Sequence, residues 1–427
     1  MEPMQTTPGK RLVTTLASSS SARDVWVTGV GFVSSLGSGA KAHGDALSAG
    51  LLNSNVDTVT FAPYTVHRLA DICLGDQIPS KADLRQMGRW QQIGVYVAGQ
   101  ALDDAQLKGD AKLIADVDLV VAAGNGERDQ DADAAVLRSL HARSPTAVPL
   151  ISALQSALRP TLYLAELSNL LAGNISITFG VTRSSRTFKG EEQAGVAAIQ
   201  DAACRIAEGI SRIALVGGAC NAERSDLHMS LELCQAMWHH DCVPICARTV
   251  DGGGIVLGSV GSFLVLEDAE HARARGVRPY ARVTSIASAR ERLALASNLT
   301  QPCEASLQSL SSELPRSPFE VLSGASGVRS AMDREMAFLE PLKRTGLVRQ
   351  VRFYGDAIGH GLEAHFTSGI ALAAIALRRR SFYPEFESGR SDHSTAERLP
   401  VDRILVTGFG HWRGAGAVLL ESVEGNE

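Results

Sequence analysis

The side chains best suited to binding a metal ion stand close together in the middle of the chain. His239, His240 and Asp241 precede Cys242, and Cys246 follows four residues later. Imidazole and thiolate groups are ligands that zinc accepts readily. Their spacing is not one of the paired-ligand patterns typical of zinc sites, so we interpret this stretch as a connecting loop and predict no bound metal.

Two further patterns could indicate ligand binding. Gly29 and Gly31 follow an apolar run as in a dinucleotide loop, but Ser34 stands where that loop needs its third glycine, so we predict no dinucleotide cofactor. Three arginines at positions 378–380 end an apolar helical pattern. Cations are favourable at the negative end of a helix dipole, and the alternative interpretation is a docking patch for an acidic partner.

The composition is that of a globular protein. The chain has 427 residues, of which 45% are apolar and 20% charged, and its net charge is −5. This charge argues against a broad basic surface for nucleic acid or anionic membranes. We predict no membrane span, because no apolar run approaches the roughly 20 residues that one requires. Seven cysteines, an odd number spread over a long chain, favour a reducing cytoplasm over a disulfide framework.

The first 22 residues are rich in serine and threonine and contain no sustained apolar stretch. We therefore predict a disordered leader over 1–22 rather than a secretion signal. Ordered structure is expected from Arg23 onward.

Short apolar runs alternate with helical patterns along the rest of the chain. Strands are predicted at 25–29, 117–123, 213–218, 263–267, 404–408 and 417–420, and helices at 40–51, 81–107, 152–171, 194–209 and 367–380. Residues 175–179 fit either a strand or a helix. Continuously apolar strands indicate sheets covered by helices on both faces. Because the runs at 213–218 and 404–408 look alike, we predict an α/β fold with two similar halves.

Several segments stand in a characteristic order: VWVTGVGFVSSLG at 25–37, KADLRQMGRW at 81–90, ALDDA at 101–105, GIVLG at 254–258, LVLEDAEHARARG at 264–276, GH at 359–360 and GFGHWRG at 408–414. Together they resemble the β-ketoacyl-acyl carrier protein synthases of the thiolase fold, from residue 23 to 421. The resemblance implies a duplicated, layered α-β-α-β-α fold with two pseudo-equivalent halves. We place these halves at 23–262 and 263–427.

The chemistry of that family requires four side chains. A cysteine at a helix N-terminus takes an acyl group from a carrier protein, two histidines stabilise the enolate formed by decarboxylation, and a lysine supports them. The resemblance places Glu192 or Gln193 at the cysteine position, Ala325 at the first histidine and Gly355 at the lysine. His360 alone is retained.

The stretch FKGEEQAG at 188–195 resembles the chain-length factors, which are the catalytically silent β-subunits of type II polyketide ketosynthases. This implies a heterodimer with an active, cysteine-bearing ketosynthase, in which the chain shapes the acyl tunnel of polyketide, polyene or fatty-acid-like elongation. Substrates would arrive on the phosphopantetheine arm of an acyl carrier protein, and no other cofactor is expected. Loops at 124–138 and 146–154 are candidates for the tunnel lining. Phe409, His411 and Trp412 are candidates for the substrate pocket.

Other interpretations stay open. Glu192 or Gln193 could simply hold the turn by hydrogen bonds, with His360 retained for structure. Alternatively, one of them could act with His360 to decarboxylate a malonyl group carried by an acyl carrier protein. A third possibility is a ketosynthase acting alone with an unrecognised nucleophile.

Overall fold

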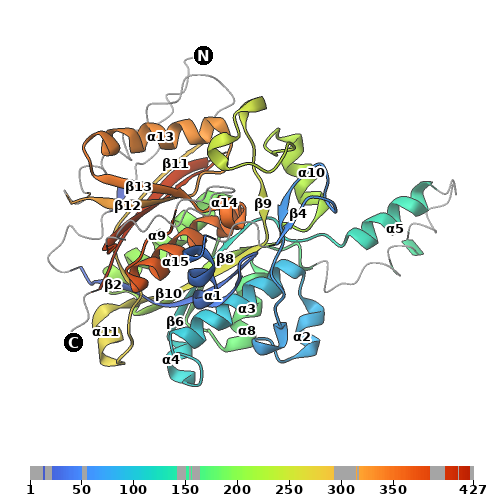
Figure 1. The fold of residues 1–427 in the computed structure, drawn as a ribbon. Coiled ribbons are helices and arrows are strands. Elements are labelled where there is room, and N and C mark those ends of the chain that lie inside the picture. The colour runs from blue at the N-terminus through green and yellow to red at the C-terminus, as the bar shows by residue number, and fades with distance from the viewer. Residues whose placement is uncertain are drawn as a thin grey trace, which may run out of the picture.

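The chain folds into five layers in the order α-β-α-β-α (Figure 1). The computed structural model describes residues 13–14, 22–50, 55–141, 151–152, 155, 164–292, 314, 317–384, 400–411 and 413–423. The two sheet layers belong to one continuous twelve-stranded sheet and alternate with three layers of helices, as the duplicated α/β pattern predicts, and a small three-stranded sheet lies apart from it. No helix in these ranges combines the length and the apolarity needed to cross a bilayer.

The first half builds a sheet in the order β2-β10-β8-β6-β7. Its strands are β2 (Val25–Ser34), β10 (Val260–Asp268), β8 (Ile213–Cys220), β6 (Val117–Ala123) and β7 (Ser184–Lys189). Helices α3 (Arg89–Asp104) and α8 (Leu170–Phe179) cover its outer face. The contact is close, because a Cβ atom at Gly31 in β2 would lie 1.8 Å from the carbonyl oxygen of Val97 in α3.

The second half builds a sheet in the order β13-β12-β14-β15-β11. Its strands are β13 (Val348–Phe353), β12 (Phe319–Ser323), β14 (Arg403–Phe409), β15 (Arg413–Glu421) and β11 (Ala281–Arg292), with α13 (Arg329–Arg344) on the outside. The two sheets join where β11 pairs with β2 over three residues.

Helices α9 (Glu192–Ala207) and α15 (His365–Arg379) form the central layer between the two sheets. Both helices contact strands of both halves. Helix α15 is buried from His365 to Leu377, as expected for a helix that is apolar on all sides. The start of each central helix is therefore fixed by packing against both sheets.

The remaining elements are short and connect these layers. They are β1 (Val13–Thr14), β3 (Gly37–Ser38), α1 (Gly39–Ser48), β4 (Val56–Asp57), β5 (Val66–His67), α2 (Lys81–Gln86), α4 (Ala111–Ala115), α5 (Gln130–His141), α10 (Ser225–Leu233), β9 (Leu257–Gly258), α11 (Ala269–Ala274) and α14 (Gly355–Ile358).

Several predicted boundaries differ from the structure. The helical pattern at 81–107 is two helices, because the chain turns at Gly88 between α2 and α3. Residues 175–179 belong to helix α8, whereas 165–169 form turns although a helix was predicted there. Strands β7 and β13 were not predicted, because both mix polar and apolar residues.

The predicted leader and the predicted division between halves stay predictions. Within the described part of 1–22, Val13 and Thr14 pair with β11. The division at 262/263 falls inside β10, which belongs to the sheet of the first half.

Candidate functional site

The site begins where the chain leaves β7 and enters α9. Gly190 makes this turn with φ of 157°, and its amide donates a hydrogen bond to Ala123 O at the end of β6. Glu192 is the first residue of α9 and is buried, and Gln193 is buried next to it. The family resemblance implies that one of these two residues stands where the catalytic cysteine is expected.

Glu192 faces His360, the retained histidine. Glu192 Oε1 lies 3.7 Å from His360 Nε2, beyond hydrogen-bond distance, and neither atom has a hydrogen-bond partner among the described residues. The backbone amide of Leu362 donates to His360 Nδ1. In the neutral ring Nε2 therefore carries the proton and directs it toward the carboxyl group.

Burial decides the charge of both groups. It raises the pKa of Glu192 to about 7, and the charge of Glu191 acts in the same direction. Burial lowers the pKa of His360 to about 3, helped by the positive charge of Arg248. Near neutral pH the two side chains thus form a weakly acidic carboxyl facing a neutral imidazole, rather than an ion pair.

A second imidazole, from His365, lies in the same pocket. Its ring lies against that of His360 at a tilt of 34°, with a centroid separation of 3.9 Å, and its Nδ1 accepts a hydrogen bond from the Gly361 amide. A Cβ atom at Gly355 would lie 3.7 Å from His365 Cε1 and 3.6 Å from Ala325 O. The structure thus brings Ala325 and Gly355 together, and His365 lies beside both.

Arg248 supplies a buried cation although position 355 carries no lysine. Its Nη2 lies 3.9 Å from Asp356 Oδ1, and its Nη1 donates to Gly254 O. Burial raises the pKa of Asp356 to about 6. The sequence analysis missed Arg248 because its position near His360 depends on how residues 238–254 fold back toward α14.

Glu363 is buried on the side of β6 and β8. A Cβ atom at Gly124 would lie 2.9 Å from both carboxylate oxygens of Glu363. Burial raises the pKa of Glu363 to about 8. We call Glu192, Arg248, His360, Glu363 and His365 together the Glu192 pocket.

The three candidate residues of the segment 408–414 differ in their relation to the Glu192 pocket. Phe409 is buried, contacts Ala415 and Phe338 and belongs to the core. His411 is half-buried, and its backbone amide helps to hold the pKa of Glu192 below the value that burial alone would give. Trp412 lies outside the described residues, as does most of the predicted tunnel loop at 146–154.

No thiol replaces the missing nucleophile within the described residues. Six cysteines are described, and none lies at the N-terminus of an α-helix. Cys220 ends β8 and is buried, and burial together with the charge of Glu363 raises its pKa well above the usual value. A thiol held protonated in this way is a poor nucleophile.

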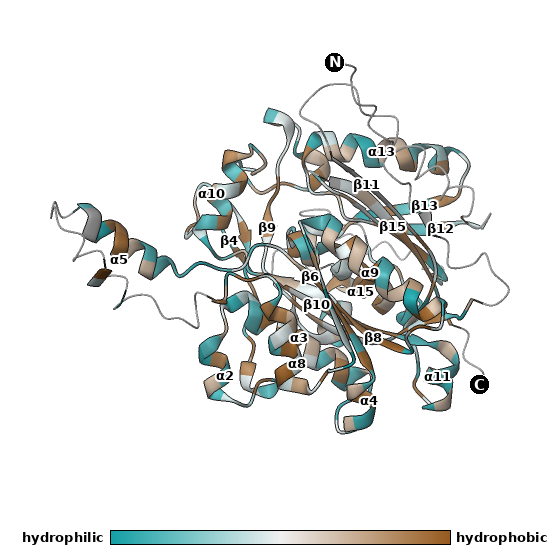
Figure 2. Cartoon of the chain, turned by 180° about the vertical axis from the view of Figure 1, so that it is seen from behind, coloured by the Kyte–Doolittle hydropathy of each residue, from teal (hydrophilic) through white to brown (hydrophobic). Residues whose placement is uncertain are grey.

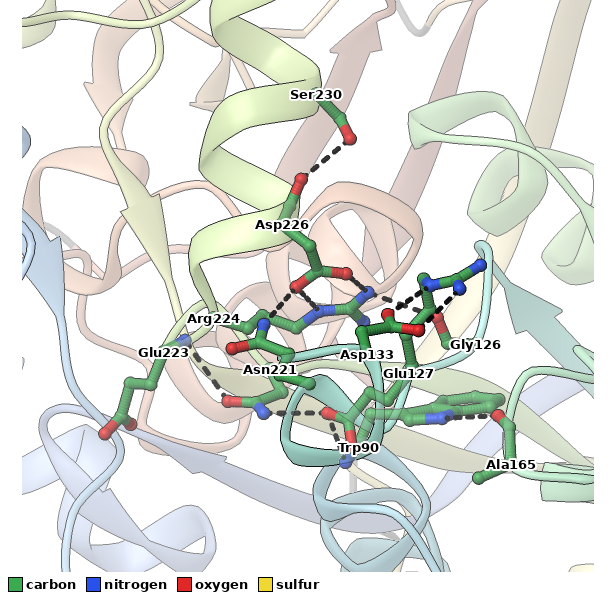
Figure 3. Close-up of polar contacts among 12 residues, drawn as sticks. Trp90, Gly126, Glu127, Asp133, Ala165, Asn221, Glu223, Arg224, Asp226 and Ser230 are labelled. Carbon is green, nitrogen blue, oxygen red and sulfur yellow. Dashed lines mark hydrogen bonds and ion pairs between the residues drawn. The ribbon is translucent and has the colours of Figure 1, made fainter. Parts of the chain in front are cut away.

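A second polar cluster is built around Glu127, which follows shortly after Gly124 in the sequence (Figure 3). Glu127 Oε1 accepts hydrogen bonds from the Trp90 amide at 3.0 Å and from Asn221 Nδ2 at 2.7 Å. Arg224 donates to Asp226 and to Gly126 O. We call Trp90, Glu127, Asn221, Arg224 and Asp226 the Glu127 cluster.

Known proteins match this chain in sequence. The family model described as "Beta-ketoacyl synthase, N-terminal domain" matches residues 22–272. The chain is 28% identical over 297 residues to 3-oxoacyl-[acyl-carrier-protein] synthase 2 of Vibrio cholerae serotype O1, and 24% identical over 273 residues to that of Staphylococcus aureus strain COL. The matches cover 66% and 61% of this chain and the same shares of those proteins, so they span less than two thirds of either relative.

Solved structures share the fold over most of the chain. The ishigamide ketosynthase/chain length factor aligns with a TM-score of 0.74 at 20% identity, covering 94% of this chain and all of that one. The AntDE:AntF complex, a type II polyketide synthase acyl-carrier protein with its ketosynthase, aligns with a TM-score of 0.69 at 18% identity and covers 94% and 100%.

Proposed function

The chain belongs to the β-ketoacyl synthase family, and from this premise we propose that it is a non-condensing, chain-length-factor-like subunit. It would pair with a cysteine-bearing ketosynthase and shape the acyl tunnel during chain elongation on an acyl carrier protein. The observation that carries the proposal is Glu192, a buried carboxyl at the start of α9, where the family resemblance places the nucleophile.

A carboxyl group cannot take over the work of that cysteine. Acyl transfer from a thioester to a thiolate exchanges one thioester for another, whereas transfer to a carboxylate would form a high-energy anhydride. With its pKa raised to about 7, the Glu192 group is also partly protonated at neutral pH. The small residues Ala325 and Gly355 further remove one hydrogen-bond donor and one cation from their expected positions.

An open sheet edge supports pairing with a second ketosynthase-like chain. Strand β7 is the last strand of its sheet, and an edge strand offers unpaired backbone groups to another chain. Exposed apolar side chains lie on α8, which contacts β7, and on α5: Ile177 on α8 is exposed by 78% and Leu137 on α5 by 55%. Helix α5 stands away from the body of the molecule and carries hydrophobic residues (Figures 1 and 2).

The first experiment tests this pairing. The chain is co-expressed with cysteine-bearing ketosynthases of its own organism, and a stable heterodimer is expected on co-purification. Ile177→Asp should abolish the complex, because it places a charge in an apolar contact. Val59→Asp is the matched control, since Val59 is exposed by 81% on the loop after β4. A homodimer that ignores every candidate ketosynthase would contradict the proposal.

The second experiment tests the role in product length. Truncation of apolar side chains in the candidate tunnel loops at 124–138 and 146–154, such as Leu137→Ala and Ile151→Ala, should lengthen the product, because smaller side chains leave the growing chain more room. Product masses from the reconstituted pair measure this directly. Unchanged product length across such a panel would argue that the chain does not limit growth. A covalent acyl adduct on this chain in intact-mass measurements would instead indicate an unrecognised nucleophile.

Malonyl decarboxylation is the second candidate function, favoured by the two unpaired buried atoms that face each other, Glu192 Oε1 and His360 Nε2, 3.7 Å apart. In this reaction the bond to the malonyl carboxylate breaks and carbon dioxide leaves. The electron pair passes to the thioester oxygen, which His360 stabilises. Glu192 then protonates the carbon and regains its proton from water. Carbon dioxide release from malonyl-acyl carrier protein, lost in His360→Ala, would support it, and its absence in the wild-type chain would exclude it.

A further inference from the structure

An exposed group of metal ligands lies outside the Glu192 pocket. His239 and His240 follow Trp238, and Asp251 lies at the far end of the same segment. One ligand atom from each of the three residues lies within 4.8 Å of the others. His240 Nε2 is already 3.0 Å from Asp251 Oδ2. Of these three ligands, Asp251 was not among the residues that the sequence pattern singled out.

We propose that His239, His240 and Asp251 bind one divalent transition-metal ion, with Zn²⁺ the expected ion. Two imidazoles and one carboxylate form a ligand set that suits zinc, leaving a further position for water. Ca²⁺ and Mg²⁺ prefer sites made of oxygen atoms, so this set disfavours them. The cysteines of the sequence pattern, Cys242 and Cys246, do not join the group.

Side-chain rotation would complete the site. Tetrahedral zinc with bonds of about 2.0–2.1 Å holds its ligand atoms about 3.4 Å apart. The ligand atoms here lie within 4.8 Å of one another, so the largest separation has to shrink by up to about 1.4 Å. The two imidazoles are exposed by 41% and 42%, and Asp251 by 70%, so these side chains have room to turn toward a common ion. Glu232 Oε2 lies 3.9 Å from His239 Nδ1 and could provide a further ligand.

The ion would tie together the two ends of residues 239–251. The middle of this segment reaches the Glu192 pocket, because the Ile245 amide donates to Asp356 Oδ1 at 2.7 Å. The Ile245 side chain lies against Gly355, 3.0 Å from where a Cβ atom there would be. Arg248 belongs to the same segment. A bound ion would therefore hold one wall of the pocket in place.

Calorimetric titration of the untagged chain with Zn²⁺ tests the proposal. One ion per chain is expected, and His239→Ala and His240→Ala should each weaken binding by about tenfold or more, because each removes a direct ligand. His141→Ala is the matched control, since His141 is an exposed histidine on α5, and it should bind like the wild-type chain. Equal affinity in the wild-type chain and in the double histidine variant would overturn the proposal, as would no binding.

Two further measurements identify the ligand atoms and the effect of the bound ion on stability. The absorption spectrum with Co²⁺ should indicate nitrogen and oxygen ligands, whereas a thiolate charge-transfer band would assign the metal to exposed cysteines and overturn the proposal. Saturating Zn²⁺ should raise the unfolding temperature of the wild-type chain but not of Asp251→Asn, because binding to the folded state stabilises it. Both measurements use this chain without a partner ketosynthase, so their outcome does not depend on whether the proposed function is correct.

Discussion

The Glu127 cluster and the Glu192 pocket are both polar and lie close together, yet they are built differently. In the Glu127 cluster every side chain has partners, as with the two donors that share Glu127 Oε1. In the Glu192 pocket the facing atoms of Glu192 and His360 have none among the described residues. Unsatisfied buried groups lower stability, so the first arrangement holds the fold together and the second is typical of a site that acts on a ligand.

The largest effect is expected at Glu127. Glu127→Ala leaves the Trp90 amide, at the start of α3, and Asn221 Nδ2 without an acceptor, and should lower the free energy of unfolding by about 4 kcal/mol. Chemical denaturation measures this. Glu127→Gln keeps one acceptor oxygen and should retain most of the stability. A small loss of unfolding free energy in Glu127→Ala would contradict the view that the Glu127 cluster holds the fold together while the Glu192 pocket does not.

A smaller, pH-dependent effect of opposite sign is expected at Glu192. The pKa of Glu192 is raised to about 7 in the folded chain from 4.5, so the folded state binds the proton more tightly. As the pH rises from 4.5 to 7, the wild-type chain should lose about 3 kcal/mol more stability than Glu192→Gln, in which only the other buried carboxyls titrate. Above pH 7 the variant should be more stable by about 3 kcal/mol. Parallel stability profiles of the two chains would show that Glu192 does not titrate in this way.

The third effect is smaller and appears on acidification. The pKa of His360 is lowered to about 3 from 6.5, so protonation of this ring opposes folding below pH 6.5. Between pH 6.5 and pH 5 this group should reduce the stability of the wild-type chain by about 2 kcal/mol. His360→Gln removes that contribution. Thermal or chemical unfolding of both chains at the two pH values gives the difference, and equal losses in both would contradict the assignment.

The sequence predicted those parts of the fold that leave a local pattern. The apolar run at 213–218 became β8, and the helix predicted from residue 194 begins at Glu192. Strand β7 was missed because its residues lie at a sheet edge and stay partly polar. Motif comparison placed the candidate site at Glu192 or Gln193, Ala325, Gly355 and His360, from the glycines and apolar runs beside them, and these assignments stay predictions.

The remaining members of the pocket could not be found in this way. Arg248 reaches the region of His360 only through the folding of a long connection, and Glu363 meets Gly124 across a separation in sequence of more than half the chain. His365 did leave a signal, since it stands five residues after His360 at the start of an apolar helix. Sequence patterns report local structure, whereas these contacts depend on how the two halves close on each other.

The position of α9 and α15 between the sheets has a consequence for any attempt to divide the protein. Glu192 comes from the first half and His360 from the second, so an isolated half would carry only one wall of the cavity. A single backbone cleavage in the connection between the halves should leave two fragments that remain associated, because each buries one central helix against the other's strands. The two halves would then have to be kept together in any engineered variant and could not be exchanged separately.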